Sequence, residues 1–136
     1  MRHFIIHTDG GARGNPGPAA IGVVVEENGQ VIHTISQTIG STTNNQAEYQ
    51  AVHAALDYAR QQGATQVDLF ADSELIVRQL KGEYKVKNKD LGPWVIKTHS
   101  LMNQIGQVTL TVIKREHNKP ADFLVNQALD RAAGLA

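Results

Sequence analysis

Two β-branched segments joined by Asn28-Gly29 constrain the fold of this chain more than any other feature. The segments AIGVVVEE (20–27) and QVIHTISQTI (30–39) have the composition of strands. An Asn-Gly pair between two strands is typical of a tight hairpin. A third apolar run, HFIIHTD (3–9), precedes them, so we expect the chain to begin with three successive strands.

Helical and strand patterns follow one another in the rest of the chain, with no linker, repeat or low-complexity segment between them. The patterns predict, in order, a helix over 44–62, a strand over 66–71, a short helix over 73–80, the basic segment KGEYKVKNK, a helix over 90–104, a strand over 107–114 and a helix that opens at Pro120. We summarise this order as βββαβαβα, an α/β fold.

The composition limits both the number of domains and the kinds of partner. With 136 residues, 41% of them hydrophobic, the chain can bury one modest core, so we expect a single domain over residues 1–136. Thirteen basic and thirteen acidic residues cancel, so a site for a polyanion must be local. The absence of cysteine excludes disulfides and thiolate sites. No apolar run suits a signal peptide or a membrane span, so we expect a cytoplasmic protein that makes no contact with membranes.

Asp9 ends an apolar run and is followed by the glycine- and proline-rich loop GGARGNPGP. Loops that bind nucleotide phosphates lead from a strand into a helix, whereas this loop leads into another strand and lacks their characteristic spacing. The loop is therefore predicted to be a tight turn, and its bare backbone would let another chain segment come close.

Glu48 occupies an unexpected place in the helix predicted over 44–62. One face of this helix is wholly polar, and Glu48 lies on the opposite, apolar face. A carboxylate desolvated there must be neutral, paired or bound to a cation. The alternative is a glutamate that extends to solvent at the start of the helix, where the helix dipole favours it.

Asp9 and Asp72 each end an apolar strand, and parallel strands bring such ends to one edge of a sheet. Taken singly, Asp72 could cap the following helix and Asp9 could form an Asx-turn. Together with Glu48 they predict a carboxylate cluster that divalent cations would stabilise, with Mg²⁺ or Mn²⁺ as the hard ions that oxygen ligands select. Two such ions about 4 Å apart support phosphoryl transfer, which indicates a nuclease or a phosphatase.

Four motifs occur along the chain in this order: TDGGARGNPGP, TTNNQAEYQA, ADSELIVRQL and HNKPADFLVNQAL. With these motifs in the family's order, the chain resembles type 1 ribonuclease H over residues 3–133. The resemblance implies a ribonuclease H-like fold with a five-stranded mixed sheet flanked by helices. It also implies hydrolysis of the RNA strand of RNA–DNA hybrids, giving 5′-phosphate and 3′-hydroxyl ends. The chain resembles the branch of the family that lacks a long basic extension, and only KGEYKVKNK stands in that place.

The resemblance also implies roles for four acids. Asp9 would bridge two Mg²⁺ ions, with Mn²⁺ as the other candidate. Glu48 and Asp72 would help to hold the ion on the leaving side, and Asp122 would hold the ion that activates water. The helical pattern places Asp122 on a flank of its helix, where it could equally be an acid favoured by the helix dipole, so its assignment rests on the resemblance.

His117 stands only five residues before Asp122, closer than the histidine that many family members carry in a longer loop. It could assist proton transfer or product release, or be an exposed loop imidazole. Four lysines of the basic segment form a modest patch whose other reading is a solvated loop. Trp94 is predicted to be a core residue.

The resemblance assigns the substrate contacts to small polar side chains, as recognition of a 2′-hydroxyl requires. Asn15, Asn44, Asn45 and Glu74 would face the RNA strand, and Thr43 would help to seat a phosphate of the DNA strand. Thr43 and Asn44 could instead cap a helix.

We expect the RNA–DNA hybrid as partner, no protein partner, and a monomer. Two alternative functions remain: another nuclease or a phosphatase of the same fold, and a module that binds hybrids without cutting them.

Overall fold

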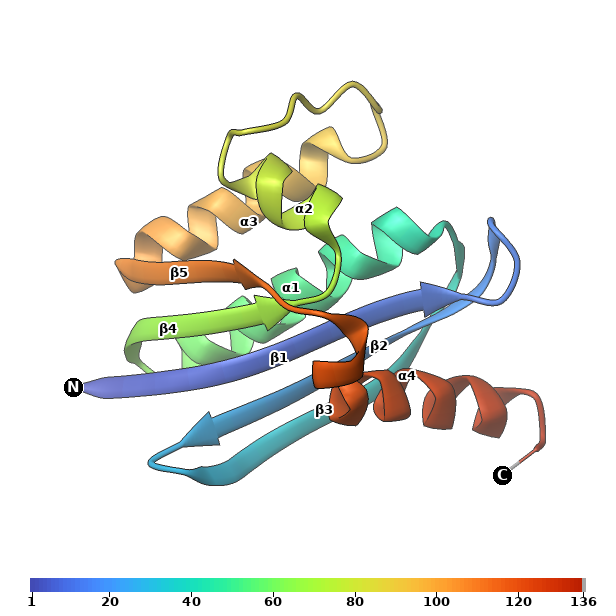
Figure 1. The fold of residues 1–136 in the computed structure, drawn as a ribbon, viewed down its shortest axis with the longest axis horizontal. Helices are drawn as coiled ribbons and strands as arrows, with labels where there is room; N and C mark the ends of the chain where they lie inside the picture. The colour runs from blue at the N-terminus through green and yellow to red at the C-terminus, as the bar shows by residue number, and fades with distance from the viewer. Residues whose placement is uncertain (136) are drawn as a thin grey trace.

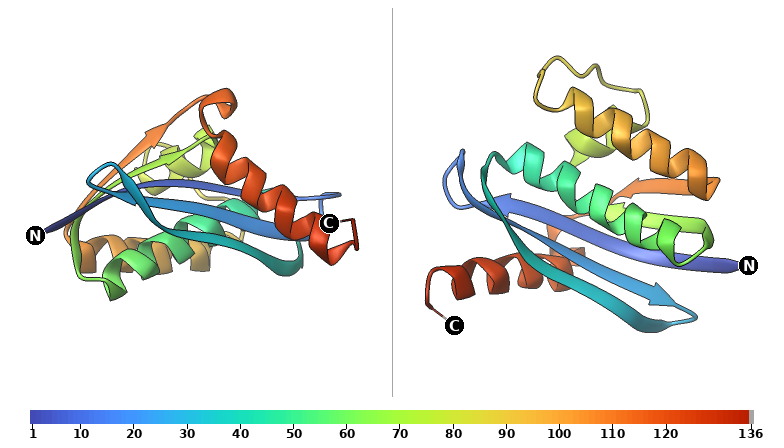
Figure 2. Two further views of the ribbon diagram at one scale, coloured as in Figure 1. Left: turned by 90° about the horizontal axis from the view of Figure 1, so that it is seen from below. Right: turned by 180° about the vertical axis from the view of Figure 1, so that it is seen from behind.

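The computed structural model describes residues 1–135, and Ala136, the last residue of the predicted domain, lies outside the described residues. A single twisted sheet forms the centre of the molecule, with helices on both faces (Figures 1 and 2). The strands are β1 (Arg2–Ala12), β2 (Gly17–Glu27), β3 (Gln30–Thr42), β4 (Ala64–Ala71) and β5 (Gln107–Val112). The helices are α1 (Asn44–Gln61), α2 (Glu74–Leu80), α3 (Gly92–Ile105), the 3₁₀ turn η1 (Arg115–His117) and α4 (Lys119–Ala132).

The sheet is mixed, in the order β3-β2-β1-β4-β5. The first three strands form an antiparallel meander, whereas β4 and β5 run parallel to β1. Asn28 and Gly29 both have positive φ, 53° and 78°, as a type I′ hairpin turn requires. The predicted hairpin is therefore confirmed, and so is the five-stranded mixed sheet.

Both helices predicted between the last two strands, over 73–80 and 90–104, are present as α2 and α3, so the summary order βββαβαβα, which counts them once, becomes βββαβααβα. The basic segment separates them as an irregular loop that extends away from the sheet (Figure 1). The short turn η1 was not anticipated, since three residues carry no readable periodicity.

The main core lies between the sheet and helices α1, α2 and α3. Its fully buried members include Phe4, Ile6, Tyr49 and Leu56, and Trp94 packs against it half-buried, as predicted. Helix α4 covers the other face through a much smaller cluster, which consists of Ala20, Val125, Ala128 and Leu129. Burial of apolar area thus holds α1 more firmly than α4.

Two glycines let helices approach the sheet closely. A Cβ at Gly10 would collide with the backbone of Ala47 in α1, and a Cβ at Gly22 would collide with the carbonyl of Ala121 in α4. The predicted close approach at the start of the glycine-rich loop is therefore found, and these contacts set the distance of each helix from β1 and β2. Among the helices of residues 1–135, none combines the length and apolarity that crossing a membrane demands.

Candidate metal centre and active site

Asp9 and Asp72 lie at the carboxyl ends of adjacent parallel strands. The register pairs Thr8 of β1 with Ala71 of β4, so the next residue of each chain segment is an aspartate. The alternative that Asp72 caps helix α2 does not hold, because Ser73 is the N-cap and its Oγ accepts a hydrogen bond from the amide of Ile76. Asp9 does accept a bond from the Gly10 amide, at 3.0 Å.

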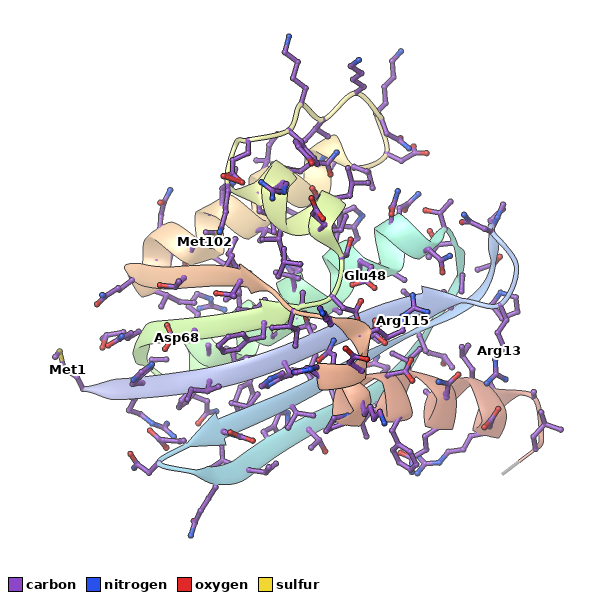
Figure 3. The ribbon with its side chains drawn as sticks, viewed as in Figure 1. Met1, Arg13, Glu48, Asp68, Met102 and Arg115 are labelled. Atoms are coloured by element: carbon purple, nitrogen blue, oxygen red, sulfur yellow. The ribbon has the colours of Figure 1, made fainter. Side chains whose placement is uncertain are left out.

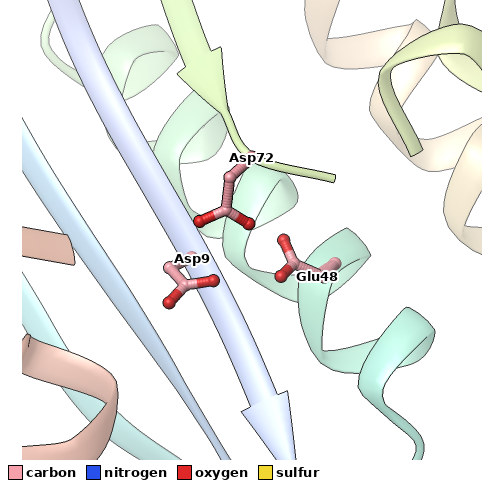
Figure 4. A group of neighbouring side chains, drawn as sticks. All are labelled: Asp9, Glu48 and Asp72. Atoms are coloured by element: carbon pink, nitrogen blue, oxygen red, sulfur yellow. The ribbon is translucent and has the colours of Figure 1, made fainter. Parts of the chain in front are cut away.

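Glu48 approaches the same point from helix α1. Its side chain is only 8% exposed, so it faces the sheet rather than extending to solvent. Ligand atoms of Asp9, Glu48 and Asp72 all lie within 4.8 Å of one another. Figure 4 shows the three carboxylates turned toward a common space from a strand, a helix and the end of a second strand. The cluster predicted from the sequence is present.

Burial and mutual repulsion disfavour the charged forms of these acids. Burial is the largest cause and raises the pKa of Asp9 to about 7; the Glu48 side chain acts against this rise, and the charges of Asp72 and Asp122 add to it. Burial, followed by the charges of Asp9 and Asp72, raises the pKa of Glu48 well above its ordinary value. Without a cation, Asp9 and Glu48 therefore keep their protons to a higher pH than ordinary carboxylic acids do.

The donor set suits a hard divalent cation. Carboxylate oxygens are the ligands that Mg²⁺ and Mn²⁺ prefer, and an ionised carboxylate can only accept hydrogen bonds. Glu48 Oε2 is buried without a hydrogen-bond partner among the described residues. A buried oxygen of this kind gains most from a cation, because nothing else compensates for its lost hydration.

Asp122 lies in the first turn of α4 and lines the same cleft as the three clustered acids. The cleft has a volume of about 320 Å³ and opens between the ends of β1 and β4, helix α1 and helix α4. Asp122 is half-buried and stands outside the group of three. Its charge nevertheless reaches Asp9, whose pKa it helps to raise.

The residues expected to contact substrate surround this cleft only in part. Asn44 and Asn45 line it. Asn15 Oδ1 accepts a bond from the amide of Asn44, and Asn44 Oδ1 accepts one from Ala12, so these asparagines fasten the glycine-rich loop to the start of α1. The side chain of Thr43 accepts a hydrogen bond from the amide of Gln46 and so caps α1. This is the helix-capping role predicted as the alternative to a phosphate contact.

Two other predicted residues stand outside the lining of the cleft. Glu74, in the first turn of α2, is exposed and forms a 2.9 Å ion pair with Arg78. The side chain of His117 is 69% exposed, and its nearest acidic partner is Glu116 at 3.9 Å. His117 is therefore an exposed imidazole at the end of η1.

Three functional candidates escaped sequence reasoning. Arg13 and Arg115, which are labelled in Figure 3, both line the cleft. Arg13 is paired with Asp130 at 2.7 Å. Asn118 is fully buried beside Asp72. The only available signal was proximity in the chain, since Arg115 and Asn118 flank the histidine that drew attention in KREHNK.

Comparison with known proteins gives the family. The family model described as reverse transcriptase-like matches residues 7–128. The bifunctional protein Rv2228c of Mycobacterium tuberculosis is 41% identical over 134 residues, which are 97% of this chain and 37% of that protein. Ribonuclease HI of Halobacterium salinarum is 41% identical over 125 residues, 91% of this chain and 63% of that protein.

Solved structures agree with this result. LC11-RNase H1 in complex with an RNA/DNA hybrid superposes with a TM-score of 0.90 at 45% identity, covering 96% of this chain and 99% of that one. The present chain thus spans 37% and 63% of the lengths of the two relatives above, but nearly the whole of this neighbour. Fold, acidic cluster and sequence similarity together show that the chain belongs to the type 1 ribonuclease H family.

Proposed function

We propose that this chain hydrolyses the RNA strand of RNA–DNA hybrids with two divalent cations, leaving 5′-phosphate and 3′-hydroxyl ends. The observation that carries the proposal is the convergence of Asp9, Glu48 and Asp72 within 4.8 Å at the floor of an open cleft. A family relative, LC11-RNase H1, has been solved in complex with such a hybrid, which supports the choice of substrate.

Four acids of this chain are the proposed ligands. Asp9 would contribute to both cation positions, Glu48 and Asp72 would help to hold the cation on the leaving side, and Asp122 would hold the cation that activates water. Mg²⁺ or Mn²⁺, once bound, neutralises the phosphate and lowers the pKa of a coordinated water. The carboxylates themselves would hold the cations in place and accept hydrogen bonds from water in the cleft.

Arg115 is the basic side chain that we propose for the reacting phosphate. It lines the cleft, and within residues 1–135 it forms no salt bridge, whereas Arg13 is occupied by Asp130. A guanidinium donates several hydrogen bonds in a plane and suits phosphate oxygens. His117, implied by the resemblance, stays a candidate for proton transfer, but it lies outside the lining of the cleft, whereas Arg115 is part of that lining.

The polar surface beside the acids is proposed to distinguish RNA from DNA. Asn15, Asn44, Asn45 and Glu74 would meet the 2′-hydroxyl face of the hybrid, and Thr43 a phosphate of the DNA strand. The exposed lysines of the basic loop, Lys81, Lys85, Lys87 and Lys89, would add contacts to phosphates.

A cleavage assay on labelled substrates tests the proposal. With Mg²⁺, we expect cutting of the RNA strand of the hybrid and no cutting of duplex DNA. Equal cutting of hybrid and duplex DNA would indicate a nuclease without hybrid preference. Tight hybrid binding without any cutting would indicate a binding module.

A further inference from the structure

Asn118 is the N-terminal cap residue of α4, yet its side chain does not cap the helix. An asparagine at this position ordinarily accepts a hydrogen bond from an amide in the first helical turn. Here only the main chain of Asn118 serves the helix, through a 3.1 Å bond from the amide of Asp122 to its carbonyl. The side chain points away from the helix and is completely buried.

The amide group of this side chain instead joins two strands of the sheet. Asn118 Nδ2 donates to the carbonyl of Thr8 at 2.9 Å and to Asp72 Oδ2 at 3.1 Å. Thr8 precedes Asp9 in β1, and Asp72 follows the last residue of β4. Both partners are acceptors, so they fix the orientation of the amide, because a carbonyl oxygen in that place would face two oxygens.

The charge of the donor matters at this place. A lysine or arginine beside Asp72 would compete with a cation for its charge, whereas a neutral amide directs one oxygen and leaves the carboxylate anionic. The bond engages Oδ2 alone, so the second oxygen stays free for the space shared with Asp9 and Glu48.

The arrangement carries a cost. Asn118 Oδ1 is buried without a hydrogen-bond partner among the described residues. In the ordinary cap geometry, Oδ1 would accept a hydrogen bond from an amide of α4. In the observed orientation that bond is absent, and Nδ2 donates the two bonds to Thr8 and Asp72 instead. The side chain thus serves Thr8 and Asp72 rather than the first turn of α4.

We propose that Asn118 is a positioning residue, which holds Asp72 in the orientation that binds the cation and couples it to strand β1 and to the helix that carries Asp122. The inference rests on the proposed cation-dependent function, and it assigns Asn118 no direct contact with ion or substrate. Positioning partners of metal ligands typically change metal affinity by about 10- to 100-fold when removed.

The test is calorimetric binding of Mn²⁺ to the free protein, together with Tm. Asn118→Ala is expected to raise the Kd for Mn²⁺ by about 10-fold. Gln79→Ala is the matched control, because Gln79 is also a buried amide with two partners, Tyr49 Oη and the Lys85 carbonyl, neither of which belongs to the acids of the cluster. The control should lower Tm and leave the Kd for Mn²⁺ unchanged.

A double-mutant cycle with Asp72→Asn separates positioning from general loosening of the fold. If Asn118 acts through Asp72, the effect of Asn118→Ala on Mn²⁺ affinity should largely disappear in the Asp72→Asn background. Asn118→Ser, which keeps a hydroxyl donor, should give an intermediate Kd and replaces Asn118→Ala if that variant does not fold.

Two outcomes overturn the inference. An unchanged Kd for Mn²⁺ in Asn118→Ala, with only Tm lowered, would make Asn118 a purely structural residue. Equal effects of Asn118→Ala with and without Asp72 would exclude action through that carboxylate. A parent protein that binds no Mn²⁺ would contradict the proposed function as well, whereas a parent that binds Mn²⁺ but cuts no hybrid would leave the positioning role standing.

Discussion

The two faces of the sheet place their acids by different means. Helix α1 brings Glu48 to the site on a large core, whereas α4 brings Asp122 on a cluster of four small and medium side chains. Glu48 is accordingly buried and part of the tight group, while Asp122 is half-buried and outside it. One half of the site is therefore built into the core. The other half is held at the edge of the core by Gly22, Asn118 and a 2.7 Å bond from Ser36 to the Leu124 carbonyl.

The largest expected effect belongs to the centre shared by both halves. Asp9→Asn should reduce hybrid cleavage by about 1,000-fold or more, because it removes the charge that we propose to bridge the cations while keeping the size of the side chain. The fold should remain, since relief of repulsion with Glu48 and Asp72 offsets the change. Steady-state cleavage with Mg²⁺ measures the loss, and near-parental activity in the variant would contradict the assignment of Asp9.

Paired glycine substitutions test the difference between the halves. Gly10→Ala should lower the free energy of unfolding by about 3 kcal/mol, and Gly22→Ala should lower it by about 1 kcal/mol. These values are the upper and lower ends of the usual cost of overpacking a core, and Gly10→Ala takes the upper end because α1 rests on the larger core. Gly22→Ala should still lower kcat by about 100-fold, since it displaces the start of α4 and with it Asp122.

Gly92→Ala is the control for both substitutions, because nothing lies within 4 Å of a Cβ there. Urea unfolding and steady-state cleavage measure the two quantities. A Gly22→Ala protein with parental kcat would show that the position of α4 is unimportant for the reaction.

Arg115 and His117 allow a finer test of the α4 side. Arg115→Ala should lower kcat by roughly 10-fold, less than the loss of a fully preorganised donor because the side chain is exposed. His117→Ala should have a smaller effect. Cleavage rates at saturating hybrid measure kcat for both variants. A larger loss in His117→Ala than in Arg115→Ala would favour His117 as the residue that assists the reaction.

The smallest expected effect concerns stability and pH in the absence of divalent cations. The unfolded chain releases the protons of Asp9 and Glu48 near pH 4, whereas the folded protein keeps that of Asp9 until about pH 7. The folded state therefore binds more protons in this window, and its stability falls as pH rises from about 4 to 7.

Substitution of Asp9 should weaken this dependence on pH. At pH 8 we expect Asp9→Asn to be more stable than the parent by about 1–2 kcal/mol, or roughly 3–8 °C in Tm. Thermal unfolding in EDTA across this range measures the effect. A parent whose Tm rises steadily from pH 4 to 7 would contradict the raised pKa values.

Sequence reasoning reached the half of the site that is built into the core. Glu48 could be found because an acid on an apolar helix face is a local contradiction, and Asp9 and Asp72 because each ends an apolar strand. Asp122 needed the family resemblance, since an acid in a first helical turn has an ordinary explanation. Arg115 and Asn118 could not be found, because their roles depend on the path of η1 across the strand ends, which no periodic pattern encodes.

The buried carboxylate cluster is proposed to be a divalent cation site. Thermal unfolding at pH 8 with increasing Mg²⁺ tests it most directly, because a cation that binds only the folded protein raises Tm with concentration. We predict a concentration-dependent rise for the parent and a much smaller rise for Asp9→Asn. A parent whose Tm does not respond to Mg²⁺ or Mn²⁺, or an Asp9→Asn variant that responds equally, would contradict the claim.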